Sequence, residues 1–460
     1  MKKIKSELFL VFLIQLLFIA TRFIYYQSPY VSHDHGNHLL IAKFIARGGL
    51  PYREFAVTHM PGLYLPLVLG FWISESLFFP MLFYFLIVSF IIPLSYQLFK
   101  EIFKNKIFAF FGLILFFTDP LLTIYSKVTT YDCLALPFLL AAMILLQKKR
   151  LQTKDYLLMT GIYFITFFIK LTTVYFLGFL LGLNFLVYFY DRQKRKEITR
   201  LIVIQVVITA VSLLLLNRFM PYLTNDVFSA HLKRFWLPVS SRISELFSTF
   251  SYSLVNLLSG FLVAIFWLFS KNKQAKLFSL FFLMYLLFSV FVPHNFWRHH
   301  LIFLIPIGSV LILFTTEKMI NFLKEKNWSW RLLILSTGLV VLGLHFFFWY
   351  TDLTYFNPEI EKLYEKAKKL PGQLFANSNY SYIVTEKEPY FWYYVTVPDV
   401  PCRCGNCTFY KDILTKSDFA LLDTNLRWKA IDENFADYLY RNFYLDLYDS
   451  RTGRALYRRR

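Results

Sequence analysis

The chain has 460 residues, of which 57% are apolar and 20% aromatic, and its mean hydropathy is +0.47. A soluble domain of this length is rarely so apolar, and runs long enough to cross a bilayer recur through residues 1–350, so the sequence predicts a polytopic membrane protein. The net charge of +20 lies almost entirely in that region, because residues 351–460 hold 16 Lys and Arg against 15 Asp and Glu. This distribution argues against a nucleic-acid-binding domain and indicates membrane topology instead.

The N-terminal segment, MKKIKSELFLVFLIQLLFIATRFIYY, begins with lysines and continues through about 20 apolar residues. No small-residue cleavage site follows it, so we predict a retained signal anchor with its basic end in the cytoplasm. Basic clusters then recur between the apolar runs, and short loops rich in Lys and Arg stay cytoplasmic. If every cluster is cytoplasmic, each interval between clusters crosses the membrane an even number of times.

This parity rule constrains two ambiguous stretches. The apolar run between Lys154 and Arg192 is too long for one span, so we predict two short helices with an outer turn at 170–173. The run at 61–77 contains two prolines, a mid-run glycine and a glutamate, and we assign it to an outer interfacial or re-entrant helix. The other predicted spans, which bring the total to about eleven and place the C-terminal region outside, are 7–26, 79–99, 107–125, 133–147, 198–219, 251–270, 277–293, 300–316 and 330–350.

The first predicted outer loop, VSHDHGNHLLIAKFIARGGLPYREFAVTHMPG, is rich in ionisable residues for a segment beside a bilayer. Asn37 is placed to cap a helix HLLIAKFIAR, whose basic and apolar residues fall on different faces, as is typical of an amphipathic helix on a membrane surface. Gly48 and Gly49 are expected to end this helix. The spacing H-x-H-x-x-H also leaves a metal site open, although interfacial histidines without a metal are commoner.

With this topology, charged residues gather at one predicted water–lipid boundary. A lipid-linked phosphate would place its head group there, where Lys, Arg and His bind anionic oxygens and a carboxylate accepts a proton from an incoming hydroxyl or amine. Ionisable groups at such depth usually serve a pathway or a site. The set comprises His33, Asp34, His35, His38, His59, Lys127, Tyr131, Asp132, Lys170, Arg298 and His299.

Four stretches that carry these residues resemble the GT-C membrane glycosyltransferases, in the branch that includes protein O-mannosyltransferase-like enzymes and lipid A aminoarabinose transferases. They are HDHGNHLLIAKFIARGGLPYREFAVTHMPGLYLPL, YSKVTTYD, FIKLTT and WRHHLIFLIPI. The resemblance implies a polytopic α-helical GT-C-like fold with outer juxtamembrane helices, in which residues 1–350 form the catalytic domain. It also implies a small extracytoplasmic α/β domain at 351–460 and a bacterial inner membrane as the location.

The resemblance further implies a glycosyltransferase that moves a sugar from a polyprenyl-phosphate donor to a lipid, glycan or protein acceptor at the outer face, with inversion. Asp34 matches the catalytic loop carboxylate, which would act as general base, and Asp132 matches a second acidic position that helps organise the site. The donor phosphate would be bound by His59, which stands where the family usually has Lys, and by Lys127, Lys170 and Arg298. His33, His35, Tyr131 and His299 would line the site. No cofactor is specified, and a divalent metal stays open.

Other interpretations stay open at the same residues. Asp34 and Asp132 also suit helix capping, and Arg298 suits contact with lipid head groups. For the whole chain, the alternatives are a transporter or flippase for a lipid-linked glycan, which would share the cationic phosphate site, and a non-catalytic GT-C relative that acts as an assembly partner.

Residues 351–460 predict a small α/β domain. NPEIEKLYEKAKKL and DENFADYLYRNF are expected helices, QLFAN and FALLD are expected short buried strands, and YLDLYDS with RALYRRR is an expected hairpin. The motif PCRCGNC holds Cys402, Cys404 and Cys407. We favour one disulfide and a free thiol there over a metal site, because no fourth ligand is adjacent.

Overall fold

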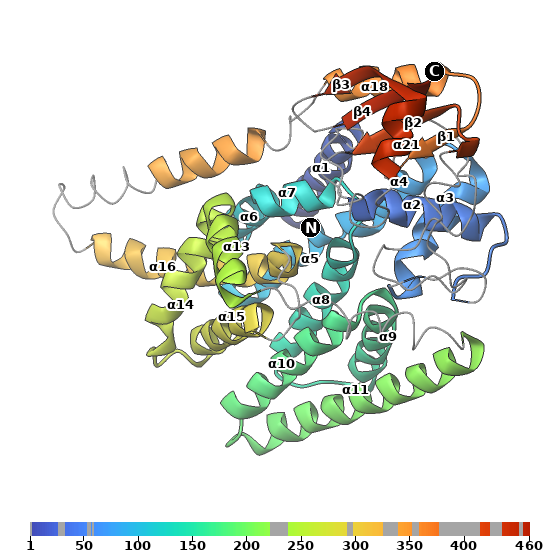
Figure 1. The fold of residues 1–460 in the computed structure, drawn as a ribbon. Coiled ribbons are helices and arrows are strands. Elements are labelled where there is room, and N and C mark those ends of the chain that lie inside the picture. Colours follow the sequence, from blue (N-terminus) through green and yellow to red (C-terminus); the bar gives the residue numbers. More distant parts are fainter. Residues whose placement is uncertain are drawn as a thin grey trace.

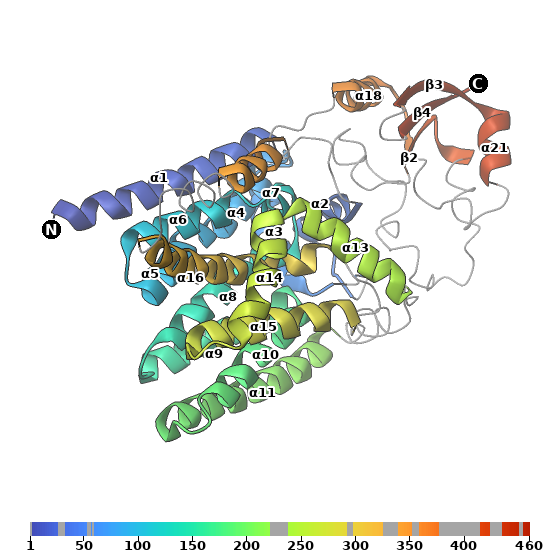
Figure 2. The same ribbon diagram turned by 90° about the vertical axis from the view of Figure 1, so that its left-hand side faces the viewer.

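The computed structural model describes residues 2–25, 33–52, 57, 59–220, 238–291, 298–324, 339–351, 358–376, 415–423, 435–449 and 454–460. These residues form a large helical part, followed by a small four-stranded sheet with its own helices (Figure 1). Figure 2 shows the N-terminus of the first helix and the sheet on opposite sides of the molecule.

Several helices of the described residues are long and apolar enough to cross a membrane. Five stretches qualify by length and composition, and two bent helix pairs raise the number to seven. The five lie in α1 (Lys2–Tyr25), α4 with α5 (Phe78–Ser89 and Ile91–Phe103), α11 (Arg192–Phe219), α15 (Lys273–Phe291) and η4 with α16 (Arg298–Leu304 and Ile305–Lys324). The chain is therefore an integral membrane protein with several apolar spans, as predicted.

Four shorter apolar helices accompany these spans. The predicted total of about eleven membrane spans stays a prediction. The four shorter helices are η1 with α3 (Pro61–Leu63 and Tyr64–Ile73), α8 (Tyr131–Gln147), α10 (Leu171–Val187) and Leu339–Thr351. α9 (Thr153–Ile169) meets α10 at Lys170, whose extended backbone separates the two helices. The predicted division of this long apolar run into two helices is thus confirmed, but the predicted turn at 170–173 is too long, because residues 171–173 already belong to α10.

Two helix pairs are sharply bent. α6 (Lys106–Phe117) and α7 (Pro120–Ser126) meet at 60°, and α13 (Val239–Tyr252) meets the π-helical turn η3 (Leu254–Ser259) and α14 (Gly260–Leu268) at 113°. A proline opens α7, where its missing N–H costs no helical hydrogen bond, and the preceding Asp119 caps the helix through Leu122 N–H at 3.2 Å. The predicted span 251–270 largely coincides with η3 and α14, which follow the second bend.

The first-loop helix differs from its prediction at one end. α2 runs from His33 to Ala46, so Asn37 lies inside the helix and the predicted cap is wrong. All residues from His35 to Phe44 are buried, and this part of α2 packs inside the protein instead of lying along an open surface. The predicted end is confirmed, because Gly48 follows with φ +94°, a left-handed conformation that favours glycine.

Close backbone packing joins α16 to the π-helical turn. A Cβ atom on Gly308 would lie 1.9 Å from the backbone oxygen of Asn256, far inside van der Waals contact. The absence of a side chain at this position therefore lets the two backbones meet.

The C-terminal sheet has the order β1-β2-β4-β3. Its strands are β1 (Leu374–Ala376), β2 (Phe419–Asp423), β3 (Phe443–Asp449) and β4 (Arg454–Arg459), and its helices include α18 (Pro358–Lys369) and α21 (Phe435–Asn442). β1 and β2 are parallel, and the other neighbouring pairs are antiparallel. The predicted helices, short strands and hairpin are confirmed, whereas Cys402, Cys404 and Cys407 lie outside the described residues.

Candidate functional site

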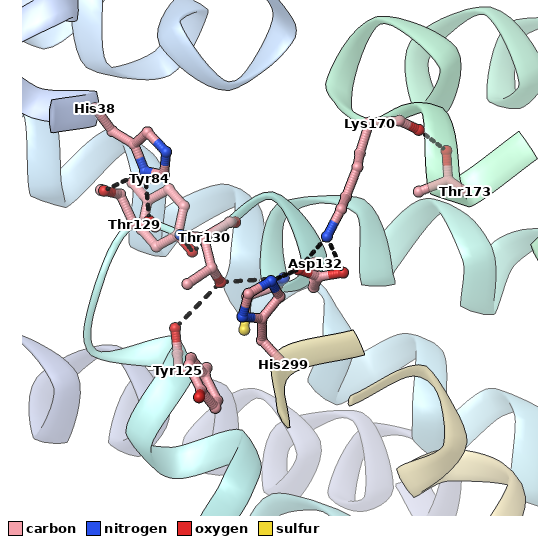
Figure 3. Close-up of polar contacts among 10 residues, drawn as sticks. His38, Tyr84, Tyr125, Thr129, Thr130, Asp132, Lys170, Thr173 and His299 are labelled. Carbon is pink, nitrogen blue, oxygen red and sulfur yellow. Dashed lines mark hydrogen bonds and ion pairs between the residues drawn. The ribbon is translucent and has the colours of Figure 1, made fainter. Parts of the chain in front are cut away.

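The segment between α7 and α8 forms the centre of the candidate site (Figure 3). α7 ends at Ser126 and α8 begins at Tyr131, so residues 127–130 connect two helices without belonging to either. Thr129 is fully buried and Thr130 is 7% exposed, which means that their backbone groups need partners within the protein. Thr130 also caps α8, because its Oγ1 accepts from Cys133 N–H at 3.4 Å.

The buried Asp132 forms an ion pair with the partly buried Lys170. Lys170 Nζ lies 2.8 Å from Oδ1 and 2.7 Å from Oδ2 of Asp132, whose side chain is 1% exposed. The break between α9 and α10 places Lys170 beside the first turn of α8, where the helix dipole also favours a carboxylate. Both carboxylate oxygens of Asp132 thus accept from the one ammonium of Lys170.

His299 completes this cluster from a third element. Its Nε2 lies 3.7 Å from Asp132 Oδ2, and its side chain is 21% exposed, unlike that of the carboxylate. Its ring also meets the Tyr125 ring edge-on at 5.6 Å. The structure thus brings together three of the predicted site residues from positions far apart in the sequence, with His299 on the more open side.

The histidines of α2 contact the same connecting segment. His35 Nδ1 accepts from Thr129 N–H at 2.9 Å, and His38 Nδ1 lies 2.8 Å from the Thr129 carbonyl oxygen. Burial, followed by the nearby charge of His38, lowers the pKa of His35 to about 3. His35 is therefore neutral at physiological pH, and it serves here as a hydrogen-bond acceptor.

An aromatic cluster connects these histidines to the predicted phosphate-binding residue His59. The Tyr131 ring lies 4.7 Å from the His38 ring and 4.6 Å from the His59 ring, measured between centroids. Its hydroxyl is 2.9 Å from that of Tyr64, and Tyr52 donates to the His59 carbonyl. His59 is thus held in position by its backbone and its ring, against Tyr131 at the start of α8.

The other two predicted phosphate-binding residues have different surroundings. Lys127 is 4% exposed at the end of α7. Arg298 forms an ion pair with Glu245, donates to Ser248 Oγ at 3.0 Å and stacks over the Tyr252 ring. Glu245 already neutralises the charge of Arg298. The described contacts of Arg298 are thus with residues 239–252, and not with Asp132, Lys170 or His299.

His33 and Asp34 stand in the first turn of α2, directly before His35, and their side chains lie outside the described residues. Their predicted roles stay predictions. Within the described part of the chain, no group of three or more His, Cys, Asp or Glu side chains is placed to hold a metal ion.

Sequence reasoning missed Tyr84 and Glu245. Tyr84 lies in the apolar run of α4 and contacts both backbone groups of Thr130, whereas Glu245 pairs with Arg298. A lone tyrosine among many aromatics gives no sequence signal. Glu245 did give a signal, because it is a charged residue in the predicted outer loop between the spans 198–219 and 251–270.

Two crystal structures of ArnT from Cupriavidus metallidurans match this chain over almost its full length. The apo structure aligns with a TM-score of 0.67 and 13% identity over 99% of this chain and 98% of that chain. The structure bound to undecaprenyl phosphate aligns with a TM-score of 0.63 and 11% identity over 98% and 97%, respectively. The chain has an ArnT-like fold.

The match confirms the predicted fold, a multi-span helical membrane part followed by a small C-terminal mixed sheet. At 11% and 13% identity the likeness concerns the fold alone. No family model matches the sequence, and no curated protein matches it either.

Proposed function

We propose that this protein is an integral membrane glycosyltransferase that moves a sugar from a polyprenyl-phosphate donor to an acceptor at the extracytoplasmic face. The observation that carries the proposal is the near-full-length fold match to an ArnT structure bound to undecaprenyl phosphate. A second observation supports it, the cluster of Asp132, Lys170 and His299. An ion pair with a buried carboxylate next to a histidine is typical of a catalytic or ligand-binding site.

In this proposal the transfer is a single displacement with inversion. The acceptor hydroxyl or amine attacks the anomeric carbon, the bond from that carbon to the phosphate oxygen breaks, and the polyprenyl phosphate leaves with the electron pair. Asp34 takes the proton from the attacking group. The phosphate is a good leaving group once its oxygens are met by cations, so the opposite side needs positive charge and no strong acid.

The described contacts favour different parts for the predicted cations. Lys170 is already neutralised by Asp132, so a phosphate near it would share the ammonium with that carboxylate. His59 lies against Tyr131 at the start of α8 and His299 lies near Asp132, so both are placed to contact a phosphate bound at the Asp132–Lys170 pair, and Lys127 belongs to the connecting segment next to it. Arg298 would contribute by leaving Glu245 or by long-range attraction.

The test is a comparison of whole-cell lipids and glycans by mass spectrometry. A strain that lacks the gene is complemented with the wild type, with Asp34→Asn or with Asp191→Asn. The last variant is a matched control, because Asp191 is an exposed cap of α11 and Asn also caps helices. We expect one sugar modification to disappear, to return with the wild type and the control, and to fall about 100-fold or more with Asp34→Asn, as for loss of a general base.

Two outcomes would overturn the proposal. Full restoration by Asp34→Asn, with equal protein levels, would exclude this residue as the base. Movement of a lipid-linked sugar across proteoliposomes without a new glycosidic bond would favour the transporter interpretation instead.

A further inference from the structure

Both backbone N–H groups of Thr129 and Thr130 donate to side chains of other helices, whereas the Thr130 carbonyl also accepts from Leu134 N–H in the first turn of α8. His35 of α2 accepts from Thr129 N–H, and His38 of α2 contacts the Thr129 carbonyl. Tyr84 of α4 accepts from Thr130 N–H at 2.9 Å, and its hydroxyl lies 3.2 Å from the Thr130 carbonyl. The backbone of these two residues is thus met by three side chains, of which Figure 3 shows His38 and Tyr84.

The two histidines carry their protons on different ring nitrogens. A nitrogen that accepts from an N–H has a free lone pair, so the proton of the neutral His35 ring is on Nε2. A carbonyl oxygen only accepts, so His38 carries its proton on Nδ1. His35 and His38 lie one turn apart on one face of α2. Together they form hydrogen bonds with the N–H and the carbonyl of Thr129.

This arrangement links the two carboxylates of the proposed site. Asp34 is the residue before His35, and Asp132 follows Thr130 by two positions in the helix that Thr130 caps. Directional hydrogen bonds fix rotation as well as distance, which apolar packing does less well. The rotation of α2 and the start of α8 are therefore set by the same few bonds.

We propose that His35, His38 and Tyr84 are positioning residues, which hold the Thr129–Thr130 segment so that the helix bearing Asp34 and the Asp132–Lys170 pair keep a fixed relative placement. The effect on transfer rests on the proposed function. The hydrogen bonds themselves do not, so they can be tested separately.

The first arm is hydrogen exchange on the full-length protein in detergent, measured by mass spectrometry on peptides that contain residues 127–131. Tyr84→Phe removes the partner of the Thr130 amide, and His35→Leu removes that of Thr129, so exchange there should become about tenfold faster or more. His35→Asn should keep the wild-type rate, because its Oδ1 can accept where Nδ1 did. Tyr96→Phe is the matched control, since this buried tyrosine donates to Glu7 outside the site.

The second arm is the transfer activity of the same variants. We expect kcat to fall at least tenfold for Tyr84→Phe and His35→Leu while the KM for the donor changes little, and we expect His35→Asn to recover most of the rate. Unchanged exchange in Tyr84→Phe and His35→Leu would overturn the proposed bonds. Faster exchange with full activity would overturn the positioning role, whereas no transfer by the wild type would reject the proposed function and leave the exchange result to decide the bonds.

Discussion

Asp119 and Asp132 are both buried carboxylates near the start of a helix, but their partners differ. Asp132 is held by the ammonium of Lys170, with the partly exposed His299 nearby. Asp119, fully buried, accepts from Ser253 Oγ at 2.6 Å, from Asn256 Nδ2 at 2.8 Å and from Leu122 N–H. Asp132 is thus hydrogen-bonded by a lysine ammonium, whereas Asp119 is hydrogen-bonded by a hydroxyl, an amide and a backbone N–H, with the His345 imidazole near enough to interact with it electrostatically.

The Asp119 contacts connect the two bent helix pairs. Asp119 lies at the α6–α7 bend, and Ser253 lies at the bend before α14. Asn256 extends the network, because it donates to the Leu115 carbonyl at 2.9 Å and accepts from Ser309 at 2.8 Å. Every partner is fixed by a helix, so this carboxylate belongs to the scaffold.

The difference indicates which buried charge is available for chemistry. An ammonium can turn from a carboxylate toward an incoming phosphate, whereas none of the described hydrogen-bond donors to Asp119 is a lysine or arginine that could do the same. We therefore expect changes at Asp132 and Lys170 to affect activity beyond their effect on folding, and changes at Asp119 to affect folding alone.

Lys170→Met should have the largest effect, because it leaves the buried Asp132 charge without its partner. A cost of about 3–5 kcal/mol is typical of such a change, and it should appear as a lower melting temperature in detergent. The double variant Asp132→Asn with Lys170→Met should recover much of that stability without recovering activity. Recovery of activity in the double variant would show that the pair is structural.

Asp119→Asn should cost about 2 kcal/mol of stability, since an amide NH2 in place of Oδ2 would face the donor groups of Ser253 and Asn256. Transfer per folded molecule should stay at the wild-type level. The measurement is activity normalised to the folded fraction from size-exclusion chromatography. A loss per folded molecule as large as that of Lys170→Met would contradict the distinction between the two carboxylates.

Acid should lower the free energy of unfolding through His35, which binds the segment next to Asp132. Its pKa is lowered to about 3 by burial in the folded protein, whereas an unfolded chain has a pKa near 6.5. Between these two pKa values the unfolded chain binds a proton at His35 that the folded protein does not bind. The free energy of unfolding is therefore at its highest above about pH 6.5, and it falls by about 2 kcal/mol on going to pH 5. Melting curves of the wild type and His35→Asn should diverge in this range, and parallel curves would contradict it.

Ser253→Ala should have the smallest effect of the series. It removes one of the three donors to Asp119 and leaves the others in place, so about 1 kcal/mol of stability should be lost. Thermal unfolding against the wild type measures it. A loss equal to that of Asp119→Asn would mean that Ser253 alone holds the carboxylate.

The sequence predicted elements whose signals are local. The strand Phe419–Asp423 matches the expected segment FALLD, and the break at Lys170 follows from a run too long for one span. The helix of the first loop was predicted with its start too late. An asparagine is a strong cap signal, yet the burial of α2 favours the longer helix.

The polar contacts were harder to predict, because their partners are distant in the chain. The motif Asp119-Pro120 reads as an ordinary helix start, and nothing near it points to Ser253, 134 residues away. His35 and His38 fitted a metal pattern, whereas their described hydrogen-bond partners are the backbone groups and the hydroxyl of Thr129. The cluster of Asp132, Lys170 and His299 was predicted as residues of one site, but the direct pairing of the first two was not.

The contact at Gly308 has a consequence for which sequences this fold accepts. Any side chain there would push α16 away from Asn256, and so disturb the network that holds Asp119. Gly161, Gly182 and Gly343 have open space around an added Cβ, and alanine would suit their helices better by about 1 kcal/mol. Sequence drift should therefore erase glycine at those three positions long before it does so at Gly308, which makes that residue a marker by which to trace remote members of this lineage.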